Sequence, residues 1–94
     1  MRSFALTFLL VATMLGTVSA ASAQSRCRVM DPTGTPLNIR AEPNGAIIGN
    51  LPNGMLVSIR DTARDRAGRG WALVQQYGSG RRFGWVFREF LACF

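Results

Sequence analysis

The stretch LNIRAEPNG, residues 37–45, places a strand pattern directly before a turn pattern. Leu37 and Ile39 alternate with polar residues, which is the spacing of a strand with one buried face. The turn that follows combines Pro43, whose φ is fixed, with Gly45, which adopts conformations that other residues avoid. The stretch therefore predicts a short strand that places Leu37 and Ile39 in a core, and a loop that projects from it.

The same alternation of strand and turn signals continues along the chain from Cys27 onward. Runs of β-branched and aromatic residues are separated by clusters of Gly, Pro and Asn, and no useful helical periodicity is found. The predicted strands are Cys27–Met30, Leu37–Arg40, Ala46–Leu51, Met55–Arg60, Trp71–Gln76 and Arg82–Phe87. Short strands in this number indicate an all-β fold, either a small barrel or a sandwich, because closure hides the edges of such a sheet.

The first 23 residues have the pattern of a secretory signal peptide. Arg2 gives a positive start, residues 4–15 are almost wholly apolar, and Ala21-Ser22-Ala23 is the small-x-small pattern that signal peptidase cuts. We expect cleavage after Ala23 and a mature periplasmic or secreted protein, residues 24–94, without a stable membrane anchor.

Two alternatives to cleavage are a retained transmembrane anchor and a lipoprotein. An anchor needs about 20 apolar residues, whereas Thr13, Gly16 and Thr17 interrupt this run. A lipoprotein modified at Cys27 needs a small residue before the cysteine, and that residue is Arg26. Both alternatives are therefore less favoured than cleavage.

The mature chain has two cysteines, one near each end. Removal of 23 of 94 residues leaves 94 − 23 = 71, and a domain of this size buries only about 60% of its unfolded surface. In an oxidising compartment Cys27 and Cys93 predict a disulfide. It would close a loop of 93 − 27 = 66 residues and stabilise the fold by roughly 4 kcal/mol. Two free thiols or a redox pair are the alternatives, although no CxxC spacing is present.

The charge of the chain is strongly positive. The sequence contains 11 basic residues, all of them Arg, against 5 acidic residues, for a net charge of +6. Loss of Arg2 with the signal peptide leaves 10 − 5 = +5. Such a surface indicates acidic partners, although charge kept for solubility explains it equally well. Nucleic acid is not an expected partner of an exported protein.

The usual catalytic constellations are absent from the sequence. There is no His, which removes Ser-His and Cys-His pairs and the commonest metal ligand. Two cysteines are too few for a structural zinc site. The carboxylates available after residue 23 are Asp31, Glu42, Asp61, Asp65 and Glu89. We expect Asp61 and Asp65 to pair with Arg64 or Arg66, and we predict no enzymatic activity, no metal and no cofactor.

The opening stretch, with the segments that follow it, resembles the bacterial SH3 (SH3b) domains. LNIRAEP is similar to their LNVRSGP signature. IIGNL at 47–51 resembles V-I-G-x-L, and NGMLVSI at 53–59 resembles a K-G turn before a V-x-V strand. WALV at 71–74 resembles W-x-x-V, and GWVFREFL at 84–91 resembles G-W-V-x-x-x-x-L. The resemblance covers residues 35–91 in the family's order.

The resemblance implies a five- or six-stranded, partly open SH3-like barrel and a binding function. Family members bind peptidoglycan or its peptide crosslinks in some cases and protein or peptide partners in others. This chain departs from the pattern at Glu42, which replaces the Gly of S-G-P, and at 61–70, a longer Arg-rich excursion. Cys27 and Cys93 also lie outside the family motif.

Aromatic and basic residues gather in the second half of the chain. In the run FGWVF, residues 83–87, alternation points Val86 to one face and Phe83, Trp85 and Phe87 to the other. SH3-type folds dock extended peptides on aromatic grooves. The candidate ligand-binding residues are therefore Trp71, Tyr77, Trp85, Arg81 and Arg82, with Arg40 as a secondary candidate.

These candidates predict a groove that Trp71 and Trp85 flank and to which Tyr77 contributes, with at least one ring partly exposed. The alternative is that the two tryptophans cover the open end of the barrel. Arg40 has its own alternative, a solvated position or an ion pair with Glu42 worth less than about 1 kcal/mol.

Together these observations predict a monomeric, non-catalytic exported binding module of the cell envelope. Its expected partner is peptidoglycan or an extended peptide of an envelope protein, bound through the aromatic groove. The alternative function is a basic electrostatic adaptor for anionic envelope polymers or acidic proteins. Its affinity would be carried by Arg64, Arg66, Arg69, Arg81 and Arg82.

Overall fold

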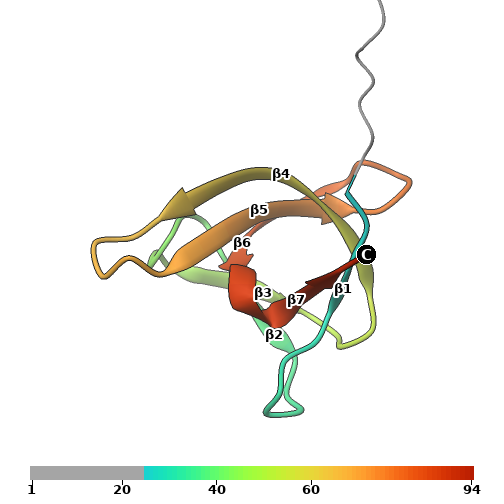
Figure 1. The fold of residues 1–94 in the computed structure, drawn as a ribbon, viewed down its shortest axis with the longest axis horizontal. Coiled ribbons are helices and arrows are strands. Elements are labelled where there is room, and N and C mark those ends of the chain that lie inside the picture. Colours follow the sequence, from blue (N-terminus) through green and yellow to red (C-terminus); the bar gives the residue numbers. More distant parts are fainter. Residues whose placement is uncertain (1–24) are drawn as a thin grey trace, which may run out of the picture.

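Seven short strands form one antiparallel sheet in the computed structural model, which describes residues 25–94 (Figure 1). The elements are β1 (Cys27–Val29), β2 (Leu37–Arg40), β3 (Ile47–Leu51), β4 (Leu56–Arg64), β5 (Gly70–Gln76), β6 (Arg82–Phe87), the 3₁₀ turn η3 (Arg88–Phe90) and β7 (Leu91–Cys93). Their order across the sheet is β3-β2-β6-β5-β4-β1-β7. The prediction of a small all-β, SH3-like barrel is confirmed. The predicted signal peptide, residues 1–23, lies outside the described residues.

Two features of the strands differ from the sequence prediction. β4 runs on to Arg64, into a segment expected to be loop, because Thr62 and Ala63 pair with Ala72 and Trp71 of β5. β7 was not expected at all, because only four residues follow η3 and no turn signal precedes them. The long β4–β5 hairpin therefore projects further from the barrel than the sequence indicated. Within residues 25–94 no helix is long and apolar enough to cross a bilayer.

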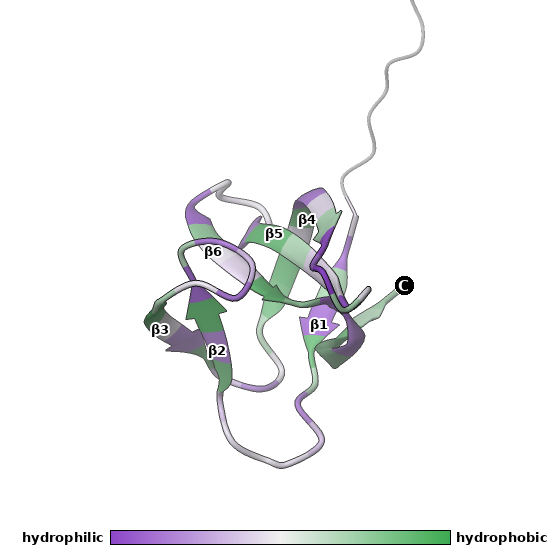
Figure 2. Ribbon diagram, turned by 90° about the vertical axis from the view of Figure 1, so that its left-hand side faces the viewer, coloured by the Kyte–Doolittle hydropathy of each residue, from purple (hydrophilic) through white to green (hydrophobic). Residues whose placement is uncertain are grey.

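The inward face of the sheet encloses a core of small aliphatic side chains, here called the barrel core. Along β2, hydrophobic and hydrophilic bands alternate (Figure 2), and Leu37 and Ile39 are buried as predicted. The barrel core consists of Cys27, Val29, Leu37, Ile39, Leu51, Val57, Ala72, Val74, Val86 and Leu91. Every strand contributes to this cluster, so the strands bury their apolar faces against one another.

A disulfide joins Cys27 to Cys93 across 66 residues of sequence, as predicted. The two cysteines are also direct partners in the register of β1 and β7. Because β1 pairs in turn with β4, the disulfide fastens the edge strand β7 to the rest of the sheet.

The loop after β2 is a tight turn over residues 42–45. The N–H of Gly45 donates to the carbonyl of Glu42 at 2.8 Å, and Asn44 takes a positive φ of 62°. Pro43 and Asn44 thus occupy the two central positions of a type II turn, in which only the second needs φ > 0. Glu42, the first residue of this turn, has no positive φ, so the position does not require the glycine found in the family pattern.

Candidate functional site

The pairing of β5 with β6 sorts the aromatic residues onto two faces of the sheet. Ala72 pairs with Val86, and both side chains lie in the barrel core. Trp71 pairs with Phe87, and Leu73 pairs with Trp85. Because neighbouring residues of a strand point to opposite faces, these last four side chains lie on the outer face. The predicted placement of Trp85 and Phe87 opposite Val86 is confirmed.

Phe83 does not follow this alternation, and the prediction that it shares a face with Trp85 is wrong. Its ring packs against the barrel core. The register of β5 and β6 shifts between Val74 and Gln75, and an extra residue in one strand reverses the alternation beyond it. Gly84, which has φ +143° at this point, allows the irregularity.

An aromatic cluster links the outer face of β5 and β6 to η3 and is called here the outer aromatic layer, comprising Trp71, Phe87 and Phe90; Phe90 also packs against the barrel core. The rings of Trp71 and Phe87 are 4.1 Å apart between centroids, and Phe90 meets Phe87 edge-on at 5.9 Å. The guanidinium of Arg69 lies 3.5 Å from the centre of the Phe87 ring, and that of Arg40 lies 6.0 Å from the Trp71 ring. Stacked arginines therefore cover much of this layer.

Trp71 is only 1% exposed, so of the two tryptophans that were expected to flank a groove, Trp85 is the one with a partly exposed ring. The reason is the β4–β5 hairpin loop, which folds back over the indole. Trp71 Nε1 donates to Asp65 Oδ2 at 3.0 Å. Asn44 Nδ2, from the turn after β2, donates to the same oxygen at 3.1 Å. The β4–β5 hairpin loop and the turn over residues 42–45 are therefore in contact beside Trp71.

Asp65 is the centre of this contact. Its other oxygen accepts the backbone N–H groups of Ala67 and Arg69 at 3.0 and 2.9 Å. The hydrogen bond from Trp71, followed by the one from the Arg69 backbone, holds the pKa of Asp65 below its usual 3.8. The expected pairing of Asp65 with Arg64 or Arg66 is not formed. In the described part of the chain the one ion pair joins Arg69 to Glu89, at 2.8 Å.

Arg40 stabilises the turn over residues 42–45. Its Nη1 donates to the carbonyl of Gly45 at 2.8 Å, and the alternative pairing with Glu42 is not formed among residues 25–94. The Arg40 guanidinium is thus occupied by the fold. A ligand contact by Arg40 remains a prediction.

Tyr77, Arg81 and Arg82 lie at the opposite end of the β5–β6 hairpin from Trp71. The 77–80 turn is exposed and Tyr77 is 37% exposed. Six residues of strand separate Trp71 from Tyr77, which amounts to roughly 20 Å. The structure therefore brings Trp71 and Trp85 to one face, but it does not bring Tyr77, Arg81 or Arg82 beside Trp71.

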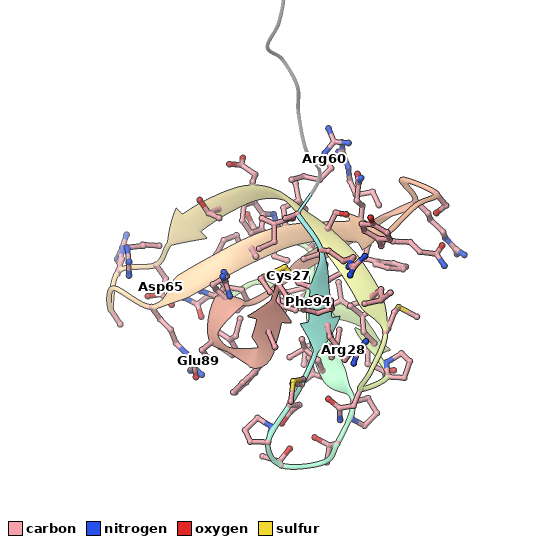
Figure 3. All side chains as sticks on the ribbon, turned by 45° about the vertical axis from the view of Figure 1, so that its right-hand side comes forward. Cys27, Arg28, Arg60, Asp65, Glu89 and Phe94 are labelled. Atoms are coloured by element: carbon pink, nitrogen blue, oxygen red, sulfur yellow. A yellow bond between two sulfur atoms is a disulfide. The ribbon has the colours of Figure 1, made fainter. Side chains whose placement is uncertain are left out.

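An open groove of about 460 Å³ lies beside Trp71 and is called here the hairpin groove. Its lining residues are Thr62, Ala63, Arg64, Gly70, Trp71 and Arg88. Arg64 Nη1 donates to the Gly68 carbonyl at 2.7 Å and Arg88 Nη1 to the Leu91 carbonyl at 3.1 Å. Figure 3 shows Asp65 and Glu89 at this end of the molecule.

Two residues of the hairpin groove were not among the ligand-binding candidates predicted from the sequence. Arg64 was expected to pair with Asp61 or Asp65 or to serve the alternative adaptor function, and Arg88 was not chosen as a candidate. The Arg-rich composition of residues 61–70 was the available signal, but the groove forms only because η3 folds back against the hairpin. A Cβ at Gly70 would lie 3.6 Å from Arg88 Cβ, so the absence of a side chain there leaves the approach open.

Residues 25–94 contain no group of three or more His, Cys, Asp or Glu side chains placed to hold a metal ion. The carboxylates have other partners within the fold. Asp65 binds Trp71, Glu89 pairs with Arg69 and Asp31 accepts the hydroxyl and backbone N–H of Thr33. The site is therefore built for contact through aromatic and guanidinium groups.

Comparison with known proteins agrees with this architecture. Residues 35–92 match the model of the bacterial SH3 domain family. No curated protein and no solved structure matches the chain. Bacterial SH3 domains are generally non-catalytic binding modules for proteins or cell-wall components, and they are often extracellular. Since the match spans 58 residues, 92 − 35 + 1, of the 94, the chain belongs to the bacterial SH3 domain family.

Proposed function

We propose that this domain is an exported, non-catalytic binding module of the cell envelope. Its ligand is a peptide of peptidoglycan or an extended segment of an envelope protein, held in the hairpin groove. The observation that carries the proposal is the lining of the groove, in which Arg64 and Arg88 lie beside Trp71, with the half-buried Trp85 on the same outer face of the sheet. Arginine together with aromatic side chains is typical of binding hot spots.

The peptide class of the ligand follows from the shape and charge of this surface. The groove is open rather than enclosed, and Trp85, half-buried on the same outer face of the sheet, pairs with Arg40 of β2. An extended peptide covers such a surface with few side chains, and its carboxylates match the arginines. Trp71 acts as the fixed wall, and Trp85 is the ring that is free to stack on the ligand.

The exported location rests on two independent features. The sequence pattern of residues 1–23 is that of a signal peptide. The Cys27–Cys93 disulfide suits an oxidising compartment, because cytosolic proteins seldom keep such bonds.

Binding of the exported protein to isolated sacculi and to separated envelope proteins tests the proposal. Arg64→Ala and Trp85→Ala should each weaken retention about tenfold, as expected for hot-spot residues, while thermal unfolding confirms that each variant is folded. Arg66→Ala is the matched control, because Arg66 is an exposed arginine of the same hairpin loop that does not line the groove. Equal weakening by Arg64→Ala and Arg66→Ala would contradict a groove.

A second candidate function, the electrostatic adaptor, is favoured by one specific observation. Of the ten arginines after Arg2, Arg69 is the one that lies within 4.0 Å of a carboxylate in the described chain. An adaptor for anionic envelope polymers would lose affinity steeply with salt. It would also lose about the same affinity for each arginine removed, whether from position 64, 66, 81 or 82.

A further inference from the structure

A row of three outward side chains runs along β1, on a part of the sheet distant in sequence from the β4–β5 hairpin. Arg26, Arg28 and Met30 are exposed, whereas Cys27 and Val29 between them are buried in the barrel core. Alternate residues of a strand repeat every ~6.6 Å on one face. The row thus presents two guanidinium groups and one apolar side chain at a regular spacing.

Phe94 orients the two arginines. Its backbone N–H donates to the Arg26 carbonyl at 2.9 Å, and its ring is 63% exposed. The guanidinium of Arg26 lies 5.0 Å from the ring centre and that of Arg28 lies 5.5 Å from it. Figure 3 shows Arg28 and Phe94 near Cys27. Contact with one shared ring restricts both side chains, so less entropy is lost when they bind a ligand.

The positive charge of this face is not compensated. Neither Arg26 nor Arg28 has a carboxylate within 4.0 Å in residues 25–94. The partners of Arg28 in the neighbouring strands are Leu56 of β4 and Ala92 of β7, and both are uncharged. A planar guanidinium with free N–H groups binds a carboxylate through two parallel hydrogen bonds.

A groove of about 490 Å³, with a mainly apolar lining, lies at the Met30 end of the row. Arg28, Met30, Pro32, Asn53 and Gly54 contribute to it. Its far wall is held by Asn53, which accepts from the Asp31 N–H at 2.6 Å and donates to the Thr35 carbonyl at 3.1 Å. Asp31 also lines the groove, and its carboxylate excludes an acidic group from that end. The polarity of the surface therefore runs from cationic at Arg26 to apolar at Met30.

We propose that this β1 face binds an acidic protein segment in an extended conformation. Two acidic residues separated by one other residue, at positions i and i+2, would lie over Arg26 and Arg28, and an apolar residue at i+4 would enter the groove at Met30. The observation that favours a peptide over a lipid headgroup is the matched repeat, because alternate side chains of an extended peptide recur at the same ~6.6 Å. The site is separate from the hairpin groove, so the proposal goes beyond the function proposed above.

Fluorescent peptides test the proposal with the whole exported protein. The probe Glu-Ser-Glu-Ser-Leu-Ser should bind, and a Gln-Ser-Gln-Ser-Leu-Ser control should bind at least about tenfold more weakly because charge-assisted hydrogen bonds are lost. Replacement of the probe's Leu by Ser should weaken binding several-fold. A scrambled probe of the same composition, with the two Glu adjacent, should also bind more weakly.

Variants of the protein locate the site. Arg26→Gln and Arg28→Gln should each weaken binding of the acidic probe about tenfold, while Arg82→Gln, a matched change of an exposed arginine on β6, should change it less than about twofold. Thermal unfolding shows that each variant is folded.

Two results would overturn the proposal. One is equal weakening by Arg28→Gln and Arg82→Gln, which shows general attraction of negative charge. The other is Arg28-dependent binding to phosphatidylglycerol vesicles with no binding of the acidic probe, which assigns the face to lipid. Because Arg64 and Trp85 are untouched in these variants, failure here leaves the hairpin-groove result unaffected.

Discussion

The barrel core and the outer aromatic layer bury apolar surface in opposite ways. The barrel core contains Val, Leu, Ile and Ala side chains and one half of a disulfide. Among residues 25–94, no aromatic side chain belongs to this buried cluster. Trp71 is equally buried, but it lies on the other face of the same sheet. The interior of so small a barrel is just wide enough for aliphatic side chains to fill, so the largest side chain has to be covered from outside.

The side chains that cover the outer aromatic layer are polar, whereas those that enclose the barrel core are apolar. Arg40, Arg69 and Asp65 complete the outer aromatic layer through cation–π contacts and hydrogen bonds. Each such contact at a partly exposed site is worth only about 0.5–1 kcal/mol. The difference teaches that the barrel core is held by apolar contacts and the disulfide, whereas the outer aromatic layer also depends on charge and pH.

The largest effect expected from a single change tests whether the outer layer also contributes to stability. Trp71→Ala should lower the free energy of unfolding by about 5 kcal/mol, at the upper end for a buried aromatic residue, since it also removes the donor to Asp65. Val86→Ala in the barrel core should cost only about 2 kcal/mol. Denaturant unfolding of both variants measures the difference. A smaller loss of unfolding free energy for Trp71→Ala than for Val86→Ala would show that the outer aromatic layer contributes little to stability.

Removal of the disulfide tests the barrel core. The double variant Cys27→Ala, Cys93→Ala should be less stable by roughly 4 kcal/mol, because the unfolded chain regains the freedom of an open loop of 66 residues. Reductant should destabilise the unmodified protein by a similar amount and leave the double variant unchanged. If the double variant unfolds at the same denaturant concentration as the oxidised protein, β7 is held without the crosslink.

Gly84 lies where β6 approaches β2, between the two apolar layers. A Cβ there would lie 2.6 Å from Ile39 Cγ2 and 2.9 Å from the Arg40 carbonyl, at a φ of +143°. Gly84→Ala should therefore cost up to about 3 kcal/mol through overpacking. Gly49→Ala is the control, since its Cβ would meet Ile39 Cδ1 at an ordinary 3.7 Å. Similar unfolding midpoints for the two variants would contradict the close approach.

The smallest effect expected concerns pH and the outer layer alone. The pKa of Asp65 is lower in the folded protein than its usual 3.8, so the carboxylate contributes stability above about pH 4 that is lost as pH falls through the folded value. Asp65→Asn should remove this part of the acid sensitivity. Thermal unfolding between pH 2 and 6 compares the two proteins. If the midpoint temperatures of the two proteins change with pH in the same way, the pKa of Asp65 does not differ between the folded and the unfolded protein.

Local pattern was sufficient for much of this fold. Alternation identified Leu37 and Ile39 as core residues and separated Val86 from Trp85 and Phe87, and turn residues placed the ends of most strands. Two cysteines after a predicted signal peptide predicted the disulfide, and short motifs in order predicted the bacterial SH3 fold. These inferences succeeded because each depends on residues near one another in sequence or on the compartment.

The candidate site could be predicted only in part. Trp85 was placed correctly on the face opposite Val86, but Phe83 was assigned to the wrong face, and no local pattern indicated that Trp71 is fully buried. The burial of Trp71 depends on Asn44 and Asp65, 21 residues apart, and a pattern within one strand carries no information about that contact. The hairpin groove likewise needs η3 and the β4–β5 hairpin to come together.

The sequence by itself determined six of the seven strands, most of their turns, the disulfide and the burial of Leu37 and Ile39, because periodicity and turn chemistry act over a few residues. Only the tertiary structure decided which faces the rings occupy. A single register shift beside Gly84 turned Phe83 inward, and a loop folding back over β5 buried Trp71. Both events depend on how distant strands and loops pack, and that packing is set by the whole sheet rather than by any one stretch of it.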